Sequence, residues 1–178
     1  TRLIGAIVMT HGDERGLKLP PRVAPIQLVI LPIAQHKEGV LDRARALKEE
    51  LERAGLRVEL DDRDTYSPGW KFNEWEMKGV PVRLELGPRD IEAGQATLVR
   101  RDSLEKFTLP LEGLAAALRA LLDSVHEGMY NKALAFREQK TVVANTFDEL
   151  AAGVQSGFAL AHWCGERGCE DVIKEKTG

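Results

Sequence analysis

The sequence predicts an α/β fold in which helices flank a mixed sheet, and three kinds of pattern support this prediction. The continuous apolar run at residues 26–31 is typical of a strand that is covered on both faces. Apolar residues recur at spacings of three and four across residues 37–54, which predicts an amphipathic helix that ends at Gly55. A leucine-rich stretch at residues 109–125 has the same period and predicts a second helix. Alternating apolar and polar residues predict further strands at residues 57–60, 81–86 and 96–100.

The segments on either side of this α/β region predict two further parts. Residues 2–11 carry the apolar stripe of a short helix, and the charged, glycine- and proline-rich residues 11–21 predict a loop at a domain boundary. After Gly128 the pattern changes. Here we expect a helix at 129–139, a strand at 141–144, a helix that starts behind a capping box at Phe147, and a strand at 156–163. We therefore expect three domains, at residues 1–21, 22–125 and 126–178.

Composition and charge narrow the possible functions. The chain has 178 residues, of which 43% are hydrophobic and 30% charged, as in a soluble globular protein. The formal net charge of −3 argues against a protein that binds polyanions through a basic excess, so any nucleic acid would be recognised by individually placed residues. The apolar runs are far shorter than the ~20 residues of a membrane span, and no signal segment opens the chain. We expect a cytoplasmic protein, and a chain that begins inside a larger one because Thr1 directly precedes a helix pattern.

Two cysteines, Cys164 and Cys169, form the sharpest local motif. They are too few for a disulfide framework, and the four residues between them include two glycines. A tight turn of this kind can aim two thiolates at one metal ion. A structural zinc ion needs four ligands, however, and the chain supplies only this pair with His162 nearby. The pair is therefore either two reduced thiols or, in the interpretation we favour, half of a zinc site that is completed outside the chain.

An aromatic-rich segment at residues 66–79 allows two interpretations. In the first, it is a turn followed by a short amphipathic helix, with Trp70 and Trp75 in the core. In the second, it joins the strand at residues 80–86 to form a surface for single-stranded RNA. On that strand Arg83 and Glu85 face away from the apolar residues, and guanidinium and carboxylate groups can bond to base edges. A solvated strand face would show the same pattern, so the sequence pattern alone leaves both open.

Longer motifs resemble those of one family, the class II prolyl-tRNA synthetases. The stretch TRLIGAIVMTHGD at residues 1–13, with RGL at 15–17 and LPPRVAP at 19–25, resembles the segment from the third class II motif into the anticodon-binding domain. The stretch SPGWKF at 67–72 is similar to the prolyl version of that domain. The resemblance implies a class IIa anticodon-binding domain, preceded by the end of a class II catalytic domain and followed by a small α+β zinc-binding domain. It also implies the archaeal/eukaryote-like branch of the family.

The same resemblance implies roles for individual residues. Thr1 and Arg2 would contact ATP, with Arg2 as the catalytic residue, because a guanidinium stacks on a flat base and donates to phosphate oxygens. Cys164 and Cys169 would be the first pair of a four-cysteine structural Zn²⁺ site whose remaining ligands lie outside the chain. The residues expected to contact tRNA are Glu76, Lys78, Arg83, Glu85, Arg89, Asp90, Arg100, Arg101 and Lys106.

The implied activity is that of a proline–tRNA ligase, which uses ATP with Mg²⁺ to activate L-proline as prolyl-adenylate and transfers it to tRNA with a proline anticodon. The resemblance implies a homodimer, and no membrane or DNA partner. The first two class II motifs and the proline pocket are absent from the sequence, so we expect this stretch alone to be inactive. One alternative is a non-catalytic tRNA-binding accessory module, against which Thr1 and Arg2 argue. A flavodoxin-like small-molecule binder is disfavoured because no phosphate loop follows residues 26–33.

Overall fold

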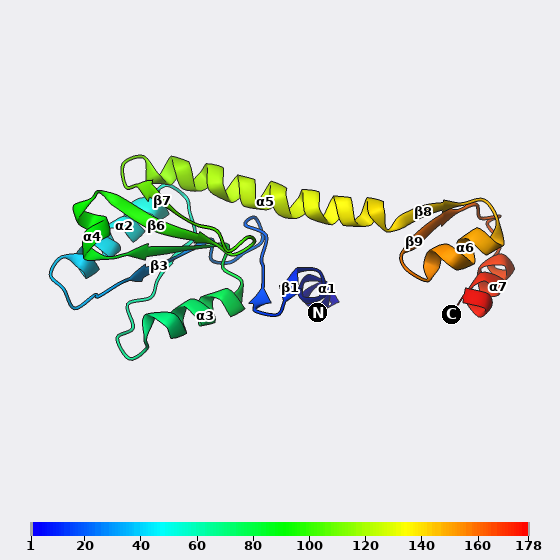
Figure 1. Ribbon diagram of the computed structural model, residues 1–178, viewed down its shortest axis with the longest axis horizontal. Helices are drawn as coiled ribbons and strands as arrows, with labels where there is room; N and C mark the ends of the chain where they lie inside the picture. The colour runs from blue at the N-terminus through cyan, green and yellow to red at the C-terminus, as the bar shows by residue number, and fades with distance from the viewer. Residues whose placement is uncertain (1, 178) are drawn as a thin grey trace. The chain divides into compact units, whose positions relative to one another are not determined.

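The computed structural model describes residues 2–177, which form two compact units (Figure 1). The first unit is Thr1–Met129 and the second is Tyr130–Gly178. The boundary between them falls within helix α5 (Leu114–Gln139), and each unit is described here by itself.

A five-stranded mixed sheet forms the centre of the first unit, as far as the described residues show. Its strands, in spatial order, are β4 (Val58–Leu60), β3 (Leu28–Pro32), β5 (Val82–Leu86), β6 (Gln95–Arg100) and β7 (Lys106–Pro110). Strand β3 is parallel to both β4 and β5, whereas β6 and β7 continue the sheet in antiparallel pairing. The α/β fold with a mixed sheet and flanking helices is therefore confirmed.

Helices cover both faces of this sheet (Figure 1). Helix α2 (Val40–Arg53) and the first part of α5 pack on one face, in a core that includes Leu28 of β3 and Leu84 of β5. Helix α3 (Pro68–Lys78) packs on the other face, where Trp75 joins Val29. Since side chains alternate along a strand, the apolar residues of β5 enter the first core and Arg83 and Glu85 face the side of α3. The predicted alternation on β5 is confirmed.

Several predicted boundaries were wrong, for identifiable reasons. Helix α2 begins at Val40 rather than at residue 37. Gly39 has a left-handed φ of 78°, so it cannot be part of a right-handed helix and lies at the N-cap instead. The helix predicted at 109–125 begins only at Leu114, because Leu109 lies in β7 and pairs with Ala96. The helices expected at 109–125 and 129–139 are one helix, α5, which runs through Gly128 at a cost of only about 1 kcal/mol relative to alanine.

The remaining elements of the first unit are short. Helix α1 (Arg2–His11) lies where it was predicted and buries none of its residues. The segment predicted as a loop contains a small antiparallel hairpin of β1 (Gly12–Asp13) and β2 (Gly16–Leu17). Helix α4 (Pro88–Glu92) connects β5 to β6.

The second unit pairs two parallel strands, β8 (Thr141–Ala144) and β9 (Phe158–Ala161), with helix α6 (Phe147–Val154). The predicted capping box is present at the start of α6, where the Thr146 hydroxyl accepts from the Glu149 N–H at 3.3 Å. Strand β9 is shorter than the predicted 156–163, and helix α7 (Arg167–Thr177) was not predicted. Across residues 2–177, no helix is both long and apolar enough to cross a membrane.

The hairpin touches the end of α3 backbone to backbone. Leu19 N–H donates to the Gly79 carbonyl at 3.1 Å, and Gly79 ends α3 with a φ of 78°. A Cβ on Gly79 would lie 2.7 Å from the Cβ of Leu17, and one on Gly16 would lie 2.5 Å from the Cα of Met77. Side chains at these two positions would force the hairpin and the helix apart, so both must be glycine.

This contact predicts that Gly79→Ala destabilises the first unit more than Gly113→Ala does. Both glycines have left-handed φ values, 78° and 70°, but a Cβ on Gly113 would meet no atom within 4 Å. Each substitution should cost about 1–2 kcal/mol for the backbone conformation, and only Gly79→Ala adds the clash with Leu17. Urea unfolding followed by circular dichroism would measure the difference, and equal losses of unfolding free energy would show that the close approach is not a constraint.

Candidate nucleic-acid interface

Helix α3 is held on the sheet through buried polar contacts. Its N-cap is Ser67, and Pro68 occupies the first helical position, where a missing N–H costs nothing. On its buried side, Trp75 Nε1 donates to Asp61 Oδ2 at 2.8 Å and Lys71 Nζ donates to the Asp61 carbonyl at 3.1 Å. These contacts fix the rotation of the helix.

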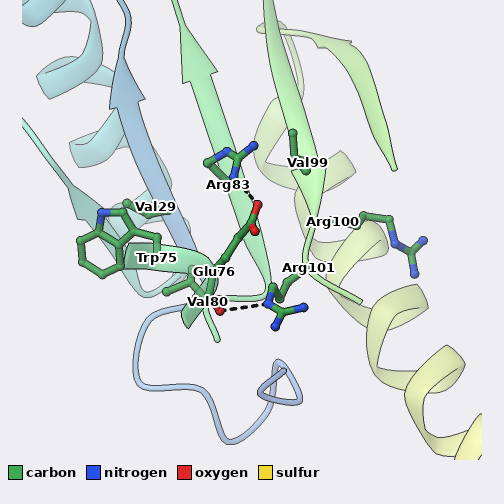
Figure 2. Close-up of a pocket in the computed structure, with 8 residues that line it drawn as sticks. All are labelled: Val29, Trp75, Glu76, Val80, Arg83, Val99, Arg100 and Arg101. Atoms are coloured by element: carbon green, nitrogen blue, oxygen red, sulfur yellow. Dashed lines mark hydrogen bonds and ion pairs between the residues drawn. The ribbon is translucent and has the colours of Figure 1, made fainter. Parts of the chain in front are cut away.

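With α3 fixed in this way, Phe72 and Glu76 meet Arg83 on β5. Figure 2 shows the ion pair between Glu76 and Arg83. The Arg83 guanidinium lies 4.1 Å from the centroid of the Phe72 ring, at the distance of a cation–π contact. Its Nη1 donates to Glu76 Oε1 at 2.9 Å, and its Nε donates to Glu85 Oε1 at 3.2 Å. One guanidinium is therefore oriented by a ring and two carboxylates.

The charged row continues across the sheet. Lys106 on β7 places its Nζ 2.8 Å from Glu85 Oε2, and the Lys106 side chain is exposed, whereas Glu85 is largely buried. At the other end, Arg15 Nη1 of the hairpin donates to Glu76 Oε2 at 3.3 Å. We refer to Glu76, Arg83, Glu85 and Lys106 as the charged row; its charges alternate in sign across α3, β5 and β7.

This arrangement suits the recognition of exposed base edges. Carboxylate oxygens accept hydrogen bonds from base N–H groups, and guanidinium and ammonium groups donate to base oxygens and ring nitrogens. The hollow between Arg83, Trp75 and Arg101 in Figure 2 has a volume of only about 10 Å³, the space of a single water molecule. A base would therefore bind on the outer surface of the row rather than inside this hollow.

Arg101, predicted as a tRNA contact, has a structural contact that the sequence did not reveal. It is buried, and its Nη1 and Nη2 donate to the two carboxylate oxygens of Asp13 at 3.0 and 2.6 Å. Its Nε donates to the Glu76 carbonyl at 2.9 Å, which Figure 2 marks with a dashed line. The hydrogen bonds from Arg101 hold the pKa of Asp13 well below its usual value. Arg101 thus clamps the hairpin to the end of α3.

Arg100 lies next to Arg101 and points away from the charged row (Figure 2). Its Nε and Nη2 donate to the two oxygens of Asp102 at 2.9 and 2.8 Å, and its Nη1 lies 3.5 Å from the hydroxyl of Ser124 on α5. The hydrogen bonds with Asp102 raise the pKa of Arg100. The structure therefore separates these two consecutive arginines from each other.

The other predicted tRNA contacts lie around the row rather than in it. Lys78 pairs with Glu74 at 2.8 Å, and its Nζ lies 4.3 Å from the Trp75 ring. Asp90 accepts from the Gly87 N–H at 2.9 Å and from the Thr97 hydroxyl at 3.2 Å, so it caps α4, while Arg89 is exposed. The structure brings four of the nine predicted residues together; a role in binding RNA stays a prediction for all nine.

The predicted ATP and metal residues lie elsewhere. Thr1 is outside the described residues, and Arg2 is the exposed first residue of α1. Cys164 and Cys169 are free thiols on either side of a turn at Gly165, and Cys169 lies in the first turn of α7. A hydrogen bond with the backbone of Glu166 lowers the pKa of the Cys164 thiol. A hydrogen bond between the two cysteine side chains raises the pKa of the Cys169 thiol. Within residues 2–177 no group of three or more His, Cys, Asp or Glu could hold a metal ion. Zinc binding by the two cysteines therefore stays a prediction.

The chain is similar in sequence to known proteins. A family model described as an anticodon binding domain matches residues 27–121, more than half of the chain. Proteins named proline–tRNA ligase from Alkaliphilus oremlandii and Acetoanaerobium sticklandii are each 56% identical over 180 residues. Proline–tRNA ligase 2 of Clostridioides difficile is 53% identical over the same length. Each comparison covers 100% of this chain and 37% of the relative, so the chain spans little more than a third of these proteins.

The clamp between Arg101 and Asp13 predicts a contribution to stability that depends on pH. The carboxyl of Asp13 has a lowered pKa in the folded state, so its contribution is present above the unfolded value of about 4 and is lost as the pH falls below it. Asp13→Asn should cost on the order of 1.5–3 kcal/mol at pH 7, as a hydrogen bond to a charged group does, and less at pH 3. Urea unfolding at both pH values tests this, with Asp123→Asn on the exposed surface of α5 as control. A loss that is the same at both pH values would contradict it.

Proposed function

The chain belongs to the anticodon-binding domain family, and we propose that it reads the anticodon of tRNA for proline as part of a proline–tRNA ligase. The observation that carries this proposal is the charged row, in which Arg83 is held between Glu76 and Glu85 within the matched region. The identity of 53–56% to proteins named proline–tRNA ligase, over the whole chain, supports the same function.

The charged row can read a base because its groups are already in place. Arg83 uses no more than three of its five N–H groups for Glu76 and Glu85, so at least two remain to donate to a base. Each carboxylate oxygen has two lone-pair directions and can accept from a base while it still contacts Arg83. Since the Phe72 ring and the carboxylates have fixed the guanidinium, little side-chain entropy would be lost on binding.

Phosphate contacts would add affinity without sequence discrimination. Lys106, Arg100 and Arg101 are proposed for this role, and the exposed Lys106 is the best placed of the three. Lys78, Arg89 and Asp90 are proposed to border the base-reading surface. Arg101 is the least accessible of the three, because its side chain is buried and three of its N–H groups donate to Asp13 and Glu76.

We extend the proposal to the complete protein, of which this chain would be the later part. The complete enzyme would activate L-proline with ATP and Mg²⁺ and transfer it to tRNA, as a cytoplasmic homodimer. Thr1 and Arg2 would contribute to the ATP site of a class II catalytic domain. The match of the proline–tRNA ligases across the whole chain, Arg2 included, favours this over a non-catalytic tRNA-binding module.

The second unit is proposed to be the start of a zinc-binding domain. Its cysteines suit a structural Zn²⁺ because two thiolates can approach one ion from either side of the Gly165 turn, which has a φ of 86°. Two further ligands would come from outside the chain. The ion would cross-link the turn to the rest of its domain and take no part in catalysis, since a closed four-thiolate site has no open position.

The proposed function predicts that Arg83→Ala reduces discrimination between anticodons. Loss of a base-reading contact should cost on the order of 1–3 kcal/mol for tRNA with the proline anticodon, by analogy with base readout in duplexes, and much less for tRNA whose anticodon is altered. The measurement is a binding titration of both tRNAs at two salt concentrations, because phosphate contacts alone weaken steeply with salt.

Two variants sharpen this test. Arg83→Lys keeps the charge but loses the planar fork, so it should also lose discrimination. Arg53→Ala removes an exposed arginine of α2, outside the charged row, and serves as the matched control. Equal weakening for every tRNA in Arg83→Ala would make Arg83 a phosphate contact, and binding by the native chain without any discrimination would remove the anticodon-reading function itself.

The proposed zinc site predicts that the chain binds Zn²⁺ through both cysteines but weakly. Competition with a chromophoric chelator should show one zinc site per chain, which is lost in both Cys164→Ser and Cys169→Ser. Addition of a complementary segment with two further cysteines should tighten the site strongly, because four thiolates complete the tetrahedron. Zinc affinity that is unchanged in Cys169→Ser would rule out this pair as ligands.

A further inference from the structure

Two exposed aromatic rings stack on each other at the start of α3. The centroids of Tyr66 and Trp70 are 3.9 Å apart, and the ring planes are inclined by only 12°. Tyr66 is 43% exposed and Trp70 is 44% exposed, whereas Trp75 on the same helix is 8% exposed. Trp75 belongs to the core beneath α3, in which Trp70 has no part. The pair is therefore a rigid aromatic surface that the fold itself does not bury.

Arg63 supports this stack from the side. Its Cζ lies 5.1 Å from the Tyr66 centroid and 5.5 Å from the Trp70 centroid. Because these two distances are nearly equal and the rings are only 3.9 Å apart, the guanidinium lies beside the pair rather than over an outer face. Arg63 is in turn fixed by Asp61, at 2.6 and 2.8 Å, and by Glu74. Arg63 thus leaves the outer faces of the stack free.

The charge beside the stack is already paired within the fold. Arg63 lies against both rings and forms ion pairs with the carboxylates of Asp61 and Glu74. A ligand would gain little from net attraction at this place, so an energetically useful contact must come from the flat ring surfaces. Aromatic side chains bind unpaired bases in this way, and the contact tolerates any sequence because every base has a π-face.

We propose that the Tyr66–Trp70 stack binds an unpaired nucleobase of the tRNA by stacking, without reading its identity. This inference rests on the proposed function for its ligand but uses a different surface. Trp70 and Phe72 are two residues apart in a helix, so they point to nearly opposite sides of α3. The base on the stack is therefore not the one that Arg83 reads. One helix presents a discriminating contact on one side and a non-discriminating contact on the other.

A fluorescence titration tests whether a base reaches the stack. The chain has three tryptophans, and Trp163→Phe leaves Trp70 and the buried Trp75 as emitters. In this background, tRNA with the proline anticodon should quench the exposed emission, and Trp70→Phe should remove the quenching. An unstructured oligonucleotide should quench in the same way, and a fully paired duplex should not.

Affinity measurements test what the stack contributes. Trp70→Ala should weaken binding by at least about fivefold, the lower end for loss of one stacked base. The loss should be equal for tRNAs with the proline and the altered anticodon, and equal at two salt concentrations. Trp70→Phe, which keeps an aromatic ring, should retain most of the affinity of the native chain for tRNA. Met77→Ala, which truncates another exposed side chain of α3 with 60% exposure, is the matched control and should bind normally.

The outcomes separate this inference from the proposed function. If Trp70→Ala binds both tRNAs like the native chain and no quenching occurs, the stack is not a base-binding surface, even where Arg83→Ala still loses discrimination. If the native chain fails to discriminate anticodons but the oligonucleotide still quenches Trp70, the stacking surface stands and the proposed function falls. Circular dichroism of Trp70→Ala verifies folding, and Tyr66→Ala, outside the helix, provides a second variant that should show the same loss.

Discussion

A single buried carboxylate, that of Asp61, fixes the helix on which the candidate interface depends. The backbone N–H of Asp61 donates to the Ile30 carbonyl in the parallel part of the sheet. Its carboxylate accepts hydrogen bonds from Trp75 Nε1 and Arg63, and forms an ion pair with Lys71. Burial raises the pKa of this carboxyl, but the hydrogen bonds from Arg63 and Trp75 outweigh that effect and leave the pKa below its usual range. An unpaired carboxylate at this depth would cost several kcal/mol. The contacts of Trp75 and Lys71 with Asp61 therefore hold α3 in its position on the sheet.

The position of α3 then decides which groups can meet a ligand. With Lys71 and Trp75 directed inward, Phe72 and Glu76 turn toward β5, and Trp70 turns outward. The groups that result are nearly neutral in sum, in keeping with the net charge of −3. Such a surface gains specificity from fixed directions of donors, acceptors and ring planes rather than from general attraction to phosphate. The folding energy spent on burying Asp61 thus also orders the interface before any ligand arrives.

The sequence predicted the parts that periodicity controls and missed those that depend on distant pairing. The alternation on β5 correctly separated Arg83 and Glu85 from the core, and the capping box at Thr146 correctly started α6. Leu109 fits the helical pattern of the leucine-rich stretch, so the sequence did not predict β7, where Leu109 pairs with Ala96. No local pattern could reveal that Arg101 binds Asp13, 88 residues earlier. Trp70 and Trp75 also look alike in sequence, and it is the apolar cluster around Val29 together with the hydrogen bond to Asp61 that buries Trp75.

Glu76 shows how the interface could bind a base without loosening the fold. One of its oxygens contacts Arg83, the other contacts Arg15, and its backbone carbonyl accepts from Arg101. The Arg15 contact is long and solvent-exposed, and such pairs contribute only about 0–1 kcal/mol, so a base N–H could replace it at small cost. The Arg101 contact is part-buried and belongs to the clamp with Asp13, so its loss would leave the Arg101 Nε–H and the Glu76 carbonyl without a hydrogen bond. Base binding would therefore displace the weak contact and keep the strong one, and the hairpin would stay clamped while Glu76 changes its partner.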